Sequence, residues 1–308
     1  MKHTFVVACN YTYLPSLAAT INAAKLYKNH AEFTIAHDDT INEEVRKAFT
    51  DSFPFKINWV DMSTLLSQVT ITSVIQPNPF WLAPWILGAQ VIDSYDSICI
   101  LQADEFLLVN VDNLFKIAAQ TDIVIATEYT CVRKEFEELP FGTTKSITNR
   151  GEYALYDQLV FMNKTHKQIL IDVYEAQCID PWKQEAQDPM CALNQACTTH
   201  LTIDKVLGLE ANIWCTDRGE WEYRLYWDSN TLKLYNNNNI RINGIHCRPW
   251  QNAVIQHGVD MAKKEGEYYR EKYENGVHNF NLLKDLQLWF NSQTPITKEL
   301  KYYTGKYE

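Results

Sequence analysis

The chain has 308 residues, and its 28 Lys and Arg against 38 Asp and Glu give a formal net charge of 28 − 38 = −10. Hydrophobic residues make up 46% of the chain and aromatic residues 13%, which excludes a chain that is disordered as a whole. The acidic balance argues against broad coating of nucleic acid, because binding to phosphates needs clustered Lys and Arg. The length suits one large domain or two modest ones.

The eight cysteines form no Cys-x-x-Cys pair, which argues against a zinc ribbon or a thioredoxin motif. Cys191, Cys197 and His200 lie close in sequence, but their spacing fits no common structural zinc site. The sequence has no run of 18 apolar residues that would predict a membrane-spanning helix, and it begins without the apolar stretch of a signal peptide. We therefore expect a cytoplasmic protein with reduced thiols.

Strand-like and helix-like segments alternate through the first 130 residues. Short apolar runs predict buried strands at residues 4–9, 33–36, 56–60, 97–101 and 122–126. Apolar residues at helical spacing predict helices at residues 14–28, 42–50 and 81–94. Strands that alternate with helices favour crossover connections and an α/β fold with a mostly parallel sheet.

The second half is less regular. The same patterns predict strands at residues 158–162, 201–206 and 240–245. They predict helices at residues 165–178, 188–199, 261–273 and 280–290, and a turn at the four asparagines 236–239. The simplest domain organisation is one compact unit over residues 1–252, with a helical extension over residues 253–308 packed on it.

The most informative segment is residues 97–115, in which an apolar strand runs directly into Asp104 and Glu105. Open α/β sheets bind ligands at the carboxyl ends of their parallel strands. Adjacent acids at that edge suit a hard divalent cation that bridges a diphosphate. A strand-ending turn with solvated acids explains the segment equally well when it is taken alone.

Three further segments carry candidate side chains. His246 and Arg248 follow an apolar strand and offer an imidazole for a metal ion and a guanidinium for a phosphate, although a lone His is more often structural. Asn10 and Tyr13 follow the first strand, where they could hold a base, although an ordinary loop has the same residues. Asp188 precedes a proline and, taken alone, is best explained as a helix cap.

Taken together and in this order, the segments resemble retaining glycosyltransferases of the glycogenin and lipopolysaccharide galactosyltransferase type, family 8. The resemblance covers roughly residues 4–252 and includes the opening strand and loop and the second strand at 33–39. Its main motifs are similar to Leu101-Gln-Ala-Asp104, the Gln187-Asp188 helix start and His246-Cys-Arg-Pro-Trp250. The family has the GT-A fold, a mostly parallel Rossmann-like sheet flanked by helices, which the resemblance implies for this chain.

The resemblance also implies a nucleotide-diphospho-sugar donor, most often a UDP-sugar, bound with Mn²⁺ or Mg²⁺. The positions implied to hold the nucleotide are Ala8, Asn10, Tyr13, Asp38, Gln102 and Arg248. The positions implied to hold the metal are Asp104, Glu105 and His246. The positions implied to contact the transferred sugar or the acceptor are Asp188, Gln187 and Asp157. In retaining members of the family the acceptor attacks the face that the leaving group occupied, so no separate strong base is required.

The sequence departs from the family pattern at four places. Gln102 replaces the first Asp of the Asp-x-Asp motif, and the helix segment 80–87 lacks the usual Lys or Arg. His246 lies two residues before Arg248, where the family has a longer glycine-containing loop. The segment 157–159 replaces an Asn-Ser-Gly motif.

Three alternatives stay open beside this interpretation. The chain could be a catalytically inactive relative that binds nucleotide-sugars, or a nucleotidyltransferase, although it lacks that class's Gly-rich, Arg-containing phosphate loop. It could also be a glycosyltransferase that acts on modified DNA bases, although the net charge weighs against a nucleic-acid partner. The acceptor stays open among glycan, protein, lipid and modified nucleic acid, as does the oligomeric state.

Overall fold

The computed structural model describes residues 1–73, 77–103, 105–107, 109–130, 153–178, 189–210, 223–228, 231–236 and 244–246. Contacts between residues divide the chain into two compact units. Unit 1 comprises residues 1–10, 30–102 and 111–211, and unit 2 comprises residues 11–29, 103–110 and 212–308. The predicted boundary at residue 252 and the predicted tail helices lie outside the described residues and stay predictions.

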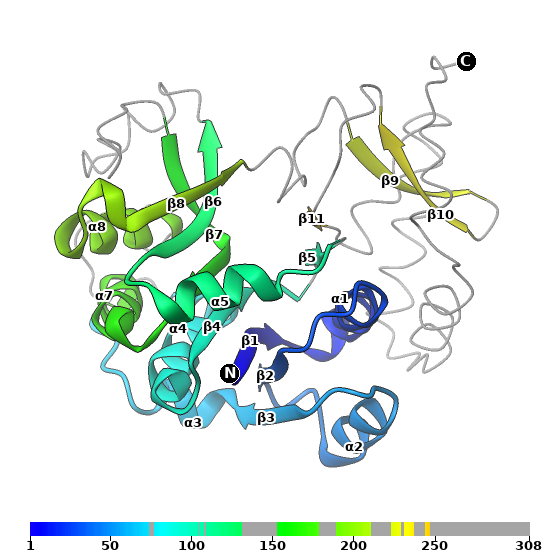
Figure 1. Ribbon diagram of the computed structural model, residues 1–308. Coiled ribbons are helices and arrows are strands. Elements are labelled where there is room, and N and C mark those ends of the chain that lie inside the picture. Colours follow the sequence, from blue (N-terminus) through cyan, green and yellow to red (C-terminus); the bar gives the residue numbers. More distant parts are fainter. Residues whose placement is uncertain are drawn as a thin grey trace, which may run out of the picture. The chain divides into compact units, whose positions relative to one another are not determined.

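Unit 1 is built on a seven-stranded sheet with the order β3-β2-β1-β4-β7-β6-β8 (Figure 1). The strands are β1 (His3–Cys9), β2 (Glu32–His37), β3 (Ile57–Asp61), β4 (Ser97–Leu101), β6 (Val124–Thr130), β7 (Tyr153–Met162) and β8 (Val206–Glu210). Strand β7 is antiparallel to both of its neighbours, and the other four pairs of neighbouring strands are parallel. The expected mostly parallel α/β sheet is therefore confirmed.

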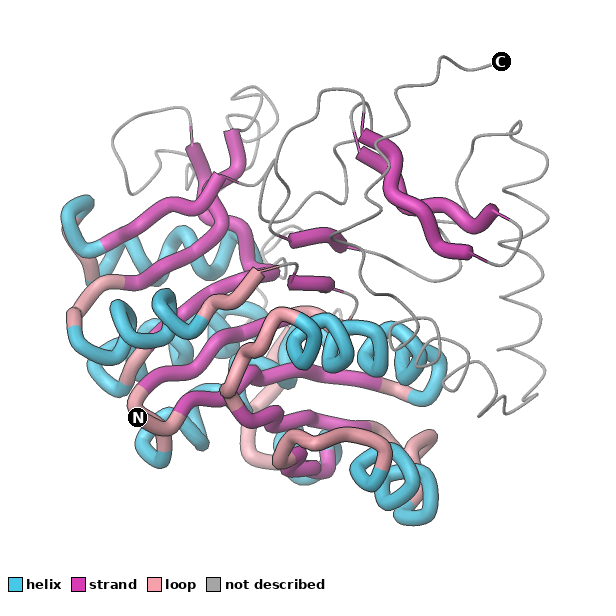
Figure 2. The backbone as a smooth tube through the Cα atoms, turned by 45° about the vertical axis from the view of Figure 1, so that its right-hand side comes forward, coloured by secondary structure: helices cyan, strands magenta, loops and turns pink. Residues whose placement is uncertain are grey.

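Helices cover both faces of this sheet (Figure 2). They are α2 (Glu43–Asp51), α3 (Met62–Leu66), α4 (Pro79–Val91), α5 (Asp112–Gln120), α7 (Lys167–Cys178) and α8 (Pro189–His200). Side chains of α3, α4, α7 and α8 share one buried cluster with Val6, Ile98, Ile100 and Val160. Residues alternate between the faces of a strand, so Phe5 and Phe161 lie on the opposite face, where their rings contact Phe115 of α5.

Local sequence signals explain the ends and the burial of the helices. The Asn42 side chain caps α2 by accepting a hydrogen bond from the Val45 N–H at 2.9 Å, and Glu43 and Glu44 occupy the first turn, where the helix dipole favours them. Helix α4 is apolar on all sides and buried from Leu82 to Ala89, as a helix enclosed by a core must be.

Unit 2 contains η1 (Tyr11–Tyr13), α1 (Leu14–Leu26), β5 (Glu105–Leu107), β9 (Tyr223–Asp228), β10 (Thr231–Asn236) and β11 (Gly244–His246). Strands β9 and β10 form an antiparallel pair, and β11 pairs antiparallel with β5. The Thr20 hydroxyl of α1 donates to the Ala103 carbonyl oxygen at 2.9 Å, and the Asn29 side chain donates to the Val109 carbonyl oxygen at 3.1 Å. These bonds fix α1 against the segment that contains β5.

One predicted strand is wrong. The sequence suggests a strand at residues 201–206, but the structure has a 3₁₀ turn, η5 (Ile203–Lys205), and the strand β8 begins only at Val206. The Lys205 N–H donates to the Thr202 carbonyl oxygen at 2.9 Å, and the Lys205 ammonium donates to the Asp122 carboxylate at 2.8 Å. Local turn formation therefore overrides the apolar pattern at this point.

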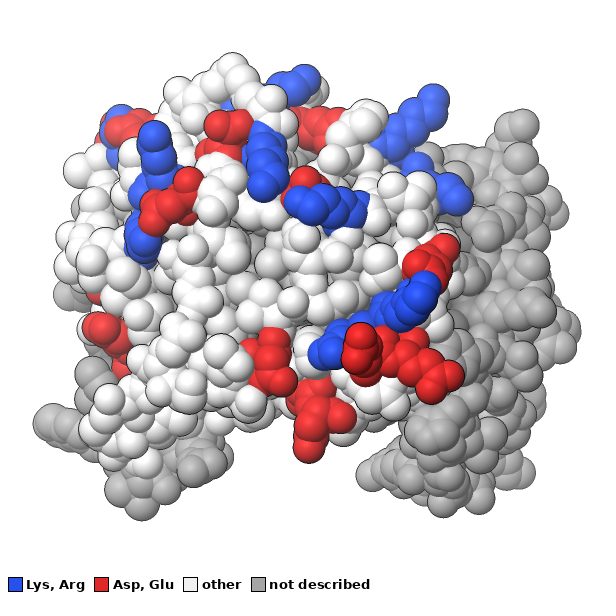
Figure 3. All heavy atoms as spheres, turned by 90° about the horizontal axis from the view of Figure 1, so that it is seen from below, with Lys and Arg blue, Asp and Glu red and all other residues white. Residues whose placement is uncertain are grey.

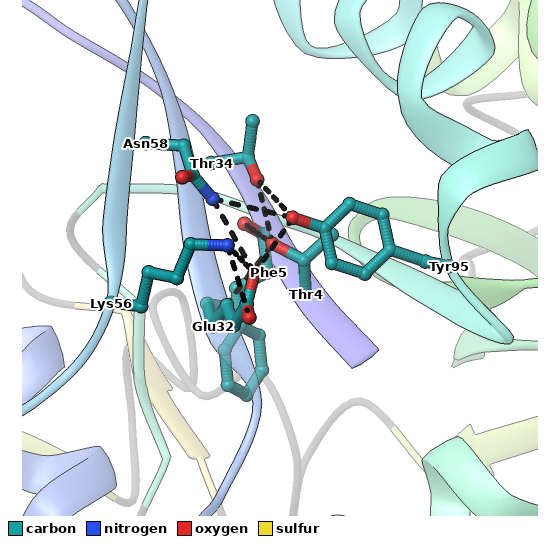
Figure 4. Close-up of polar contacts among 7 residues, drawn as sticks. All are labelled: Thr4, Phe5, Glu32, Thr34, Lys56, Asn58 and Tyr95. Atoms are coloured by element: carbon teal, nitrogen blue, oxygen red, sulfur yellow. Dashed lines mark hydrogen bonds and ion pairs between the residues drawn. The ribbon is translucent and has the colours of Figure 1, made fainter. Parts of the chain in front are cut away.

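A network of polar side chains lies over β1, β2 and β3, where the strands begin (Figure 4). The Glu32 carboxylate accepts from the Tyr95 hydroxyl at 2.9 Å and from the Lys56 ammonium at 3.1 Å. Burial raises the pKa of Glu32, but the hydrogen bonds from Tyr95 and Lys56 outweigh burial and hold the pKa below its usual range. The network ties three neighbouring strands together at the edge opposite to their carboxyl ends.

His166 joins η3 (Lys164–His166) to the loop before β6 and is 2% exposed. Its Nδ1 accepts from the Asn163 N–H at 3.2 Å, and its Nε2–H donates to the Asp122 carbonyl oxygen at 3.1 Å. Burial lowers the pKa of His166, so the unfolded chain binds a proton more readily than the folded chain. The neutral ring therefore contributes stability that is fully present above the unfolded pKa of about 6.5.

We expect this stability to be lost as pH falls from about 6.5 toward the lowered folded pKa. The loss is at most about 1.4 kcal/mol for one proton over one pH unit. Urea denaturation of the wild type and His166→Gln at several pH values checks this. The difference in unfolding free energy between the two proteins should shrink as the buffer becomes more acidic. A constant difference would contradict a buried neutral imidazole.

Candidate functional site

In unit 1, two of the sequence-predicted positions lie side by side at the carboxyl ends of neighbouring parallel strands. Cys9 of β1 pairs with His37 of β2, and Asn10 and Asp38 are the next residues along their strands. Neighbouring strands lie about 4.8 Å apart, so both side chains begin at the same edge of the sheet. Ala8, within β1, pairs with Ala36 and is part of the same edge.

The end of β2 also carries a contact that the sequence analysis missed. The Arg46 guanidinium of α2 donates from Nη1 to Nε2 of His37 at 2.5 Å. His37 is 3% exposed, and its Nδ1–H donates to the Asp38 carbonyl oxygen at 2.8 Å, which leaves Nε2 as the acceptor of a neutral ring. Nine residues separate Arg46 from His37, and no pattern within one helix or one strand links them.

The carboxyl end of β4 meets an irregularity in β7. Leu101 pairs with Leu159, so Gln102 lies beside Gln158 of the antiparallel strand. Ala126 of β6 pairs with Val160 of β7, but the next residue, Thr127, pairs with Tyr156. Residues 157–159 of β7 therefore form a bulge between these two pairs. Bulges are common beside functional sites, where they redirect a side chain. Asp157, one of the predicted contacts for the sugar or the acceptor, is part of this bulge and is half-buried.

The strand at this bulge also holds a hydrogen-bonded pair of polar side chains, Gln158 and Tyr156, that was not among the predicted site residues. The Gln158 side chain is 3% exposed and donates from Nε2 to the Tyr156 hydroxyl at 2.6 Å. Leu155, one residue earlier, is held by Asn194 of α8, which accepts from the Leu155 N–H at 2.9 Å and donates to its carbonyl oxygen at 2.8 Å. Helix α8 therefore fixes the strand beside the bulge.

In unit 2, the β5–β11 pair sets Glu105 directly opposite His246 in register. The sequence proposes both residues as metal ligands, and the register is consistent with that hypothesis. Glu105 is fully buried. A carboxylate and an imidazole form a donor set that suits Mn²⁺ better than Mg²⁺, because Mg²⁺ prefers oxygen ligands alone. Tyr13, the residue before α1, also belongs to unit 2 and is half-buried.

Four predicted positions lie outside the described residues: Asp104, Gln187, Asp188 and Arg248. Helix α8 begins at Pro189, immediately after Asp188, as the sequence predicts. Among the described residues, no group of three or more His, Cys, Asp or Glu side chains could hold a metal ion. None of the described helices is long and apolar enough to cross a membrane.

Acidic and basic side chains are mixed on the face shown in Figure 3. Ion pairs recur over the described surface, among them Lys47 with Asp51 at 2.5 Å and Lys205 with Asp122 at 2.7 Å. Binding of nucleic acid is indicated by basic side chains gathered on one face, and on the described part of this face the basic side chains lie among acidic ones.

The sequence matches no protein-family model, and no curated protein is similar to it in sequence. Solved structures are similar in fold. The galactosyltransferase LgtC, in complex with donor and acceptor sugar analogues, matches with 15% identity and a TM-score of 0.52, over 89% of this chain and 96% of LgtC. Mouse xyloside xylosyltransferase 1 matches with 12% identity and a TM-score of 0.53, over 82% of this chain and 99% of that enzyme.

The bifunctional glycosyltransferase WbbM matches with 11% identity and a TM-score of 0.55 over 90% of this chain. The chain spans only about half of WbbM, 52% of its length. At these identities the similarity concerns the fold. The chain has the GT-A fold of these glycosyltransferases, as the resemblance in sequence predicted.

Proposed function

We propose that the chain is a retaining glycosyltransferase that transfers a sugar from a nucleotide-diphospho-sugar, most simply a UDP-sugar, to a hydroxyl acceptor. The observation that carries the proposal is the set of polar side chains at the carboxyl edge of a GT-A sheet: Asn10, Asp38, Gln102 and Asp157. Open α/β sheets bind ligands at this edge. The similarity to an enzyme solved with donor and acceptor sugar analogues supports the same class of substrate.

In the proposed mechanism, the chain's own residues bind and orient the donor. Asn10 and Asp38 hold the base, Tyr13 stacks on it, and Arg248 binds a phosphate oxygen bidentately. Asp157 and the Gln187-Asp188 pair bind hydroxyls of the transferred sugar and orient its anomeric carbon toward the acceptor.

Charge develops on the diphosphate as the sugar leaves, and fixed positive groups lower the barrier to that step. Arg248 supplies one such group. Asp104, Glu105 and His246 would hold a divalent cation, which when bound would neutralise charge on the diphosphate. Gln102 favours a second candidate, a relative that binds the donor without transferring its sugar, because a neutral amide is a weaker metal ligand than a carboxylate.

A donor screen tests the proposal. We expect slow release of nucleoside diphosphate from one donor in a panel of UDP-, GDP-, CDP- and TDP-sugars, faster with Mn²⁺ than without it. Asp104→Ala should reduce this rate by roughly 10²–10³, the usual effect of losing one charge-stabilising group. Asp93→Ala is the control, because Asp93 is exposed and pairs only with Lys167 within the described structure. Binding of UDP without hydrolysis of any donor would favour the inactive relative.

A further inference from the structure

The side-chain amide of Asn194, in α8, binds only backbone groups among its recorded contacts. Its Oδ1 accepts from the Leu155 N–H at 2.9 Å, and its Nδ2 donates to the Leu155 carbonyl oxygen at 2.8 Å. Nδ2 also donates to the Met190 carbonyl oxygen at 2.8 Å. A side-chain amide has two N–H donors, so both are used. Asn194 is 4% exposed, and burial from water strengthens such bonds.

The Asn194 amide pairs with Leu155 as a residue of a neighbouring strand would. In an antiparallel pair, two opposite residues exchange an N–H donor and a carbonyl acceptor, and a side-chain amide offers the same two groups. Strand β4 ends at Leu101, which pairs with Leu159 of β7. The part of β7 that contains Leu155 therefore extends beyond the end of β4, and α8 supplies a side chain that pairs with it there.

Asp157 lies two residues after Leu155, in the bulge of β7. The regular pairing of β6 with β7 is interrupted at residues 157–159, so the position of Asp157 depends on the contacts that fix β7 beside the bulge. Asn194 supplies one at Leu155, and the Thr127 hydroxyl supplies another by donating to the Tyr156 carbonyl oxygen at 3.4 Å. The bond to Met190, in the first turn of α8, fixes the Asn194 side chain on its helix.

We propose that Asn194 is a positioning residue for sugar transfer, which holds β7 so that the Asp157 carboxylate is oriented toward the transferred sugar. This inference rests on the proposed function, in which Asp157 binds a hydroxyl of that sugar. Asn10 and Asp38, proposed to hold the base, follow β1 and β2, and β4 lies between β1 and β7 in the sheet. Asn194 should therefore affect the rate of transfer rather than binding of the nucleotide.

Steady-state kinetics of nucleoside diphosphate release from the donor test this inference. We expect Asn194→Ala to lower kcat by roughly tenfold or more, because a small misplacement of an orienting group is enough to slow a reaction. The KM for the donor should stay within about threefold, and calorimetry should show unchanged binding of UDP. Asn194→Ser keeps one hydroxyl for the same backbone groups and should show a smaller loss. Gln195→Ala, at the exposed next position, should leave kcat unchanged.

A loss of stability alone should not produce this result. Leu193→Ala is the control, because Leu193 is fully buried in the same helix and its truncation removes apolar contacts. We expect Leu193→Ala to lower the melting temperature at least as much as Asn194→Ala does. Assayed well below both melting temperatures, Leu193→Ala should keep a kcat within about threefold of the wild type. An equal fall in kcat in Leu193→Ala and Asn194→Ala would overturn the inference.

A double variant shows whether Asn194 acts through Asp157. In the Asp157→Ala background, Asn194→Ala should lower kcat by less than about threefold, because the carboxylate that it positions is absent. The same fall in kcat in both backgrounds, or no fall in Asn194→Ala alone, would overturn this inference and leave the proposed function intact. If the wild type releases no nucleoside diphosphate from any donor, the proposed function fails, and this inference fails with it.

Discussion

Phe115→Ala is expected to lower the free energy of unfolding by about 3–5 kcal/mol, the usual cost of removing a buried aromatic ring from a core. The Phe115 side chain is fully buried. Its ring centroid lies 5.1 Å from that of Phe5, 5.0 Å from that of Phe161 and 5.0 Å from that of His3. These contacts join α5 to strands β1 and β7, so the cavity would open between a helix and the centre of the sheet.

Chemical denaturation at neutral pH measures this loss. Ile117→Ala is the matched control, because Ile117 belongs to the same helix but is 37% exposed. We expect the control to change the unfolding free energy by less than about 1 kcal/mol. Phe115→Leu should fall between the two, because it keeps part of the apolar volume. An equal loss in Phe115→Ala and Ile117→Ala would show that helix propensity, rather than the aromatic cluster, sets the effect.

Much of the secondary structure of unit 1 could be predicted, because the sequence patterns that indicate its strands and helix ends are local. The run at residues 97–101 is apolar throughout most of its length, as a strand buried on both faces must be, and it coincides with β4. The cap at Asn42 and the proline at the start of α8 fix two helix ends within one residue of their predicted positions. Each of these signals acts within a few residues of the feature that it predicts.

The elements that were missed depend on partners far along the chain. Strand β5 has three residues and is defined by its pairing with β11, which no local apolar pattern reveals. The strand β7 begins at Tyr153 rather than at residue 158, because the bulge at 157–159 interrupts its alternation of apolar and polar residues. Helix α5 (Asp112–Gln120) begins a few residues after Asp104 and Glu105. The sequence gives no separate helix there, because the apolar residues at the start of α5 fall within the segment 97–115 that contains those two acids.

The candidate site was predictable in part for the same reason. Asn10 and Asp38 follow strands with clear apolar runs, and their proximity follows from the pairing of β1 with β2. The contact of Arg46 with His37 was not predictable, because it depends on a side chain that crosses from a helix to the end of a strand. The opposition of Glu105 and His246 required the register of β5 with β11, which only the structure provides.

Gln102→Asp is expected to tighten the binding of Mn²⁺ in the presence of UDP by at least roughly tenfold, because the charge of the ligands sets the affinity of a site for a divalent cation. Gln102 directly follows β4 and stands where the resembled family has the first Asp of its Asp-x-Asp motif. The substitution would restore that motif, because the new carboxylate stands two residues before Asp104 in the sequence.

The same substitution should destabilise the chain in the absence of metal, because two carboxylates that share a metal site repel one another when the site is empty. Thermal unfolding with and without Mn²⁺ and UDP separates the two effects. The melting temperature of Gln102→Asp should lie below that of the wild type without ligands and should rise further than the wild type when both ligands are added. Gln90→Asp adds the same charge at an exposed position near the end of α4 and should not increase the response to the ligands.

A rise in donor hydrolysis together with tighter binding of Mn²⁺ would mean that Gln102 alone limits metal-assisted activity in this chain. Tighter binding with unchanged hydrolysis would instead mean that the metal can bind while the transfer step lacks another group, such as the base that the helix segment 80–87 does not supply. No change in metal binding would contradict the metal site at the end of β4. In that case the positive charge of Arg248 would have to stabilise the leaving diphosphate without a cation beside it.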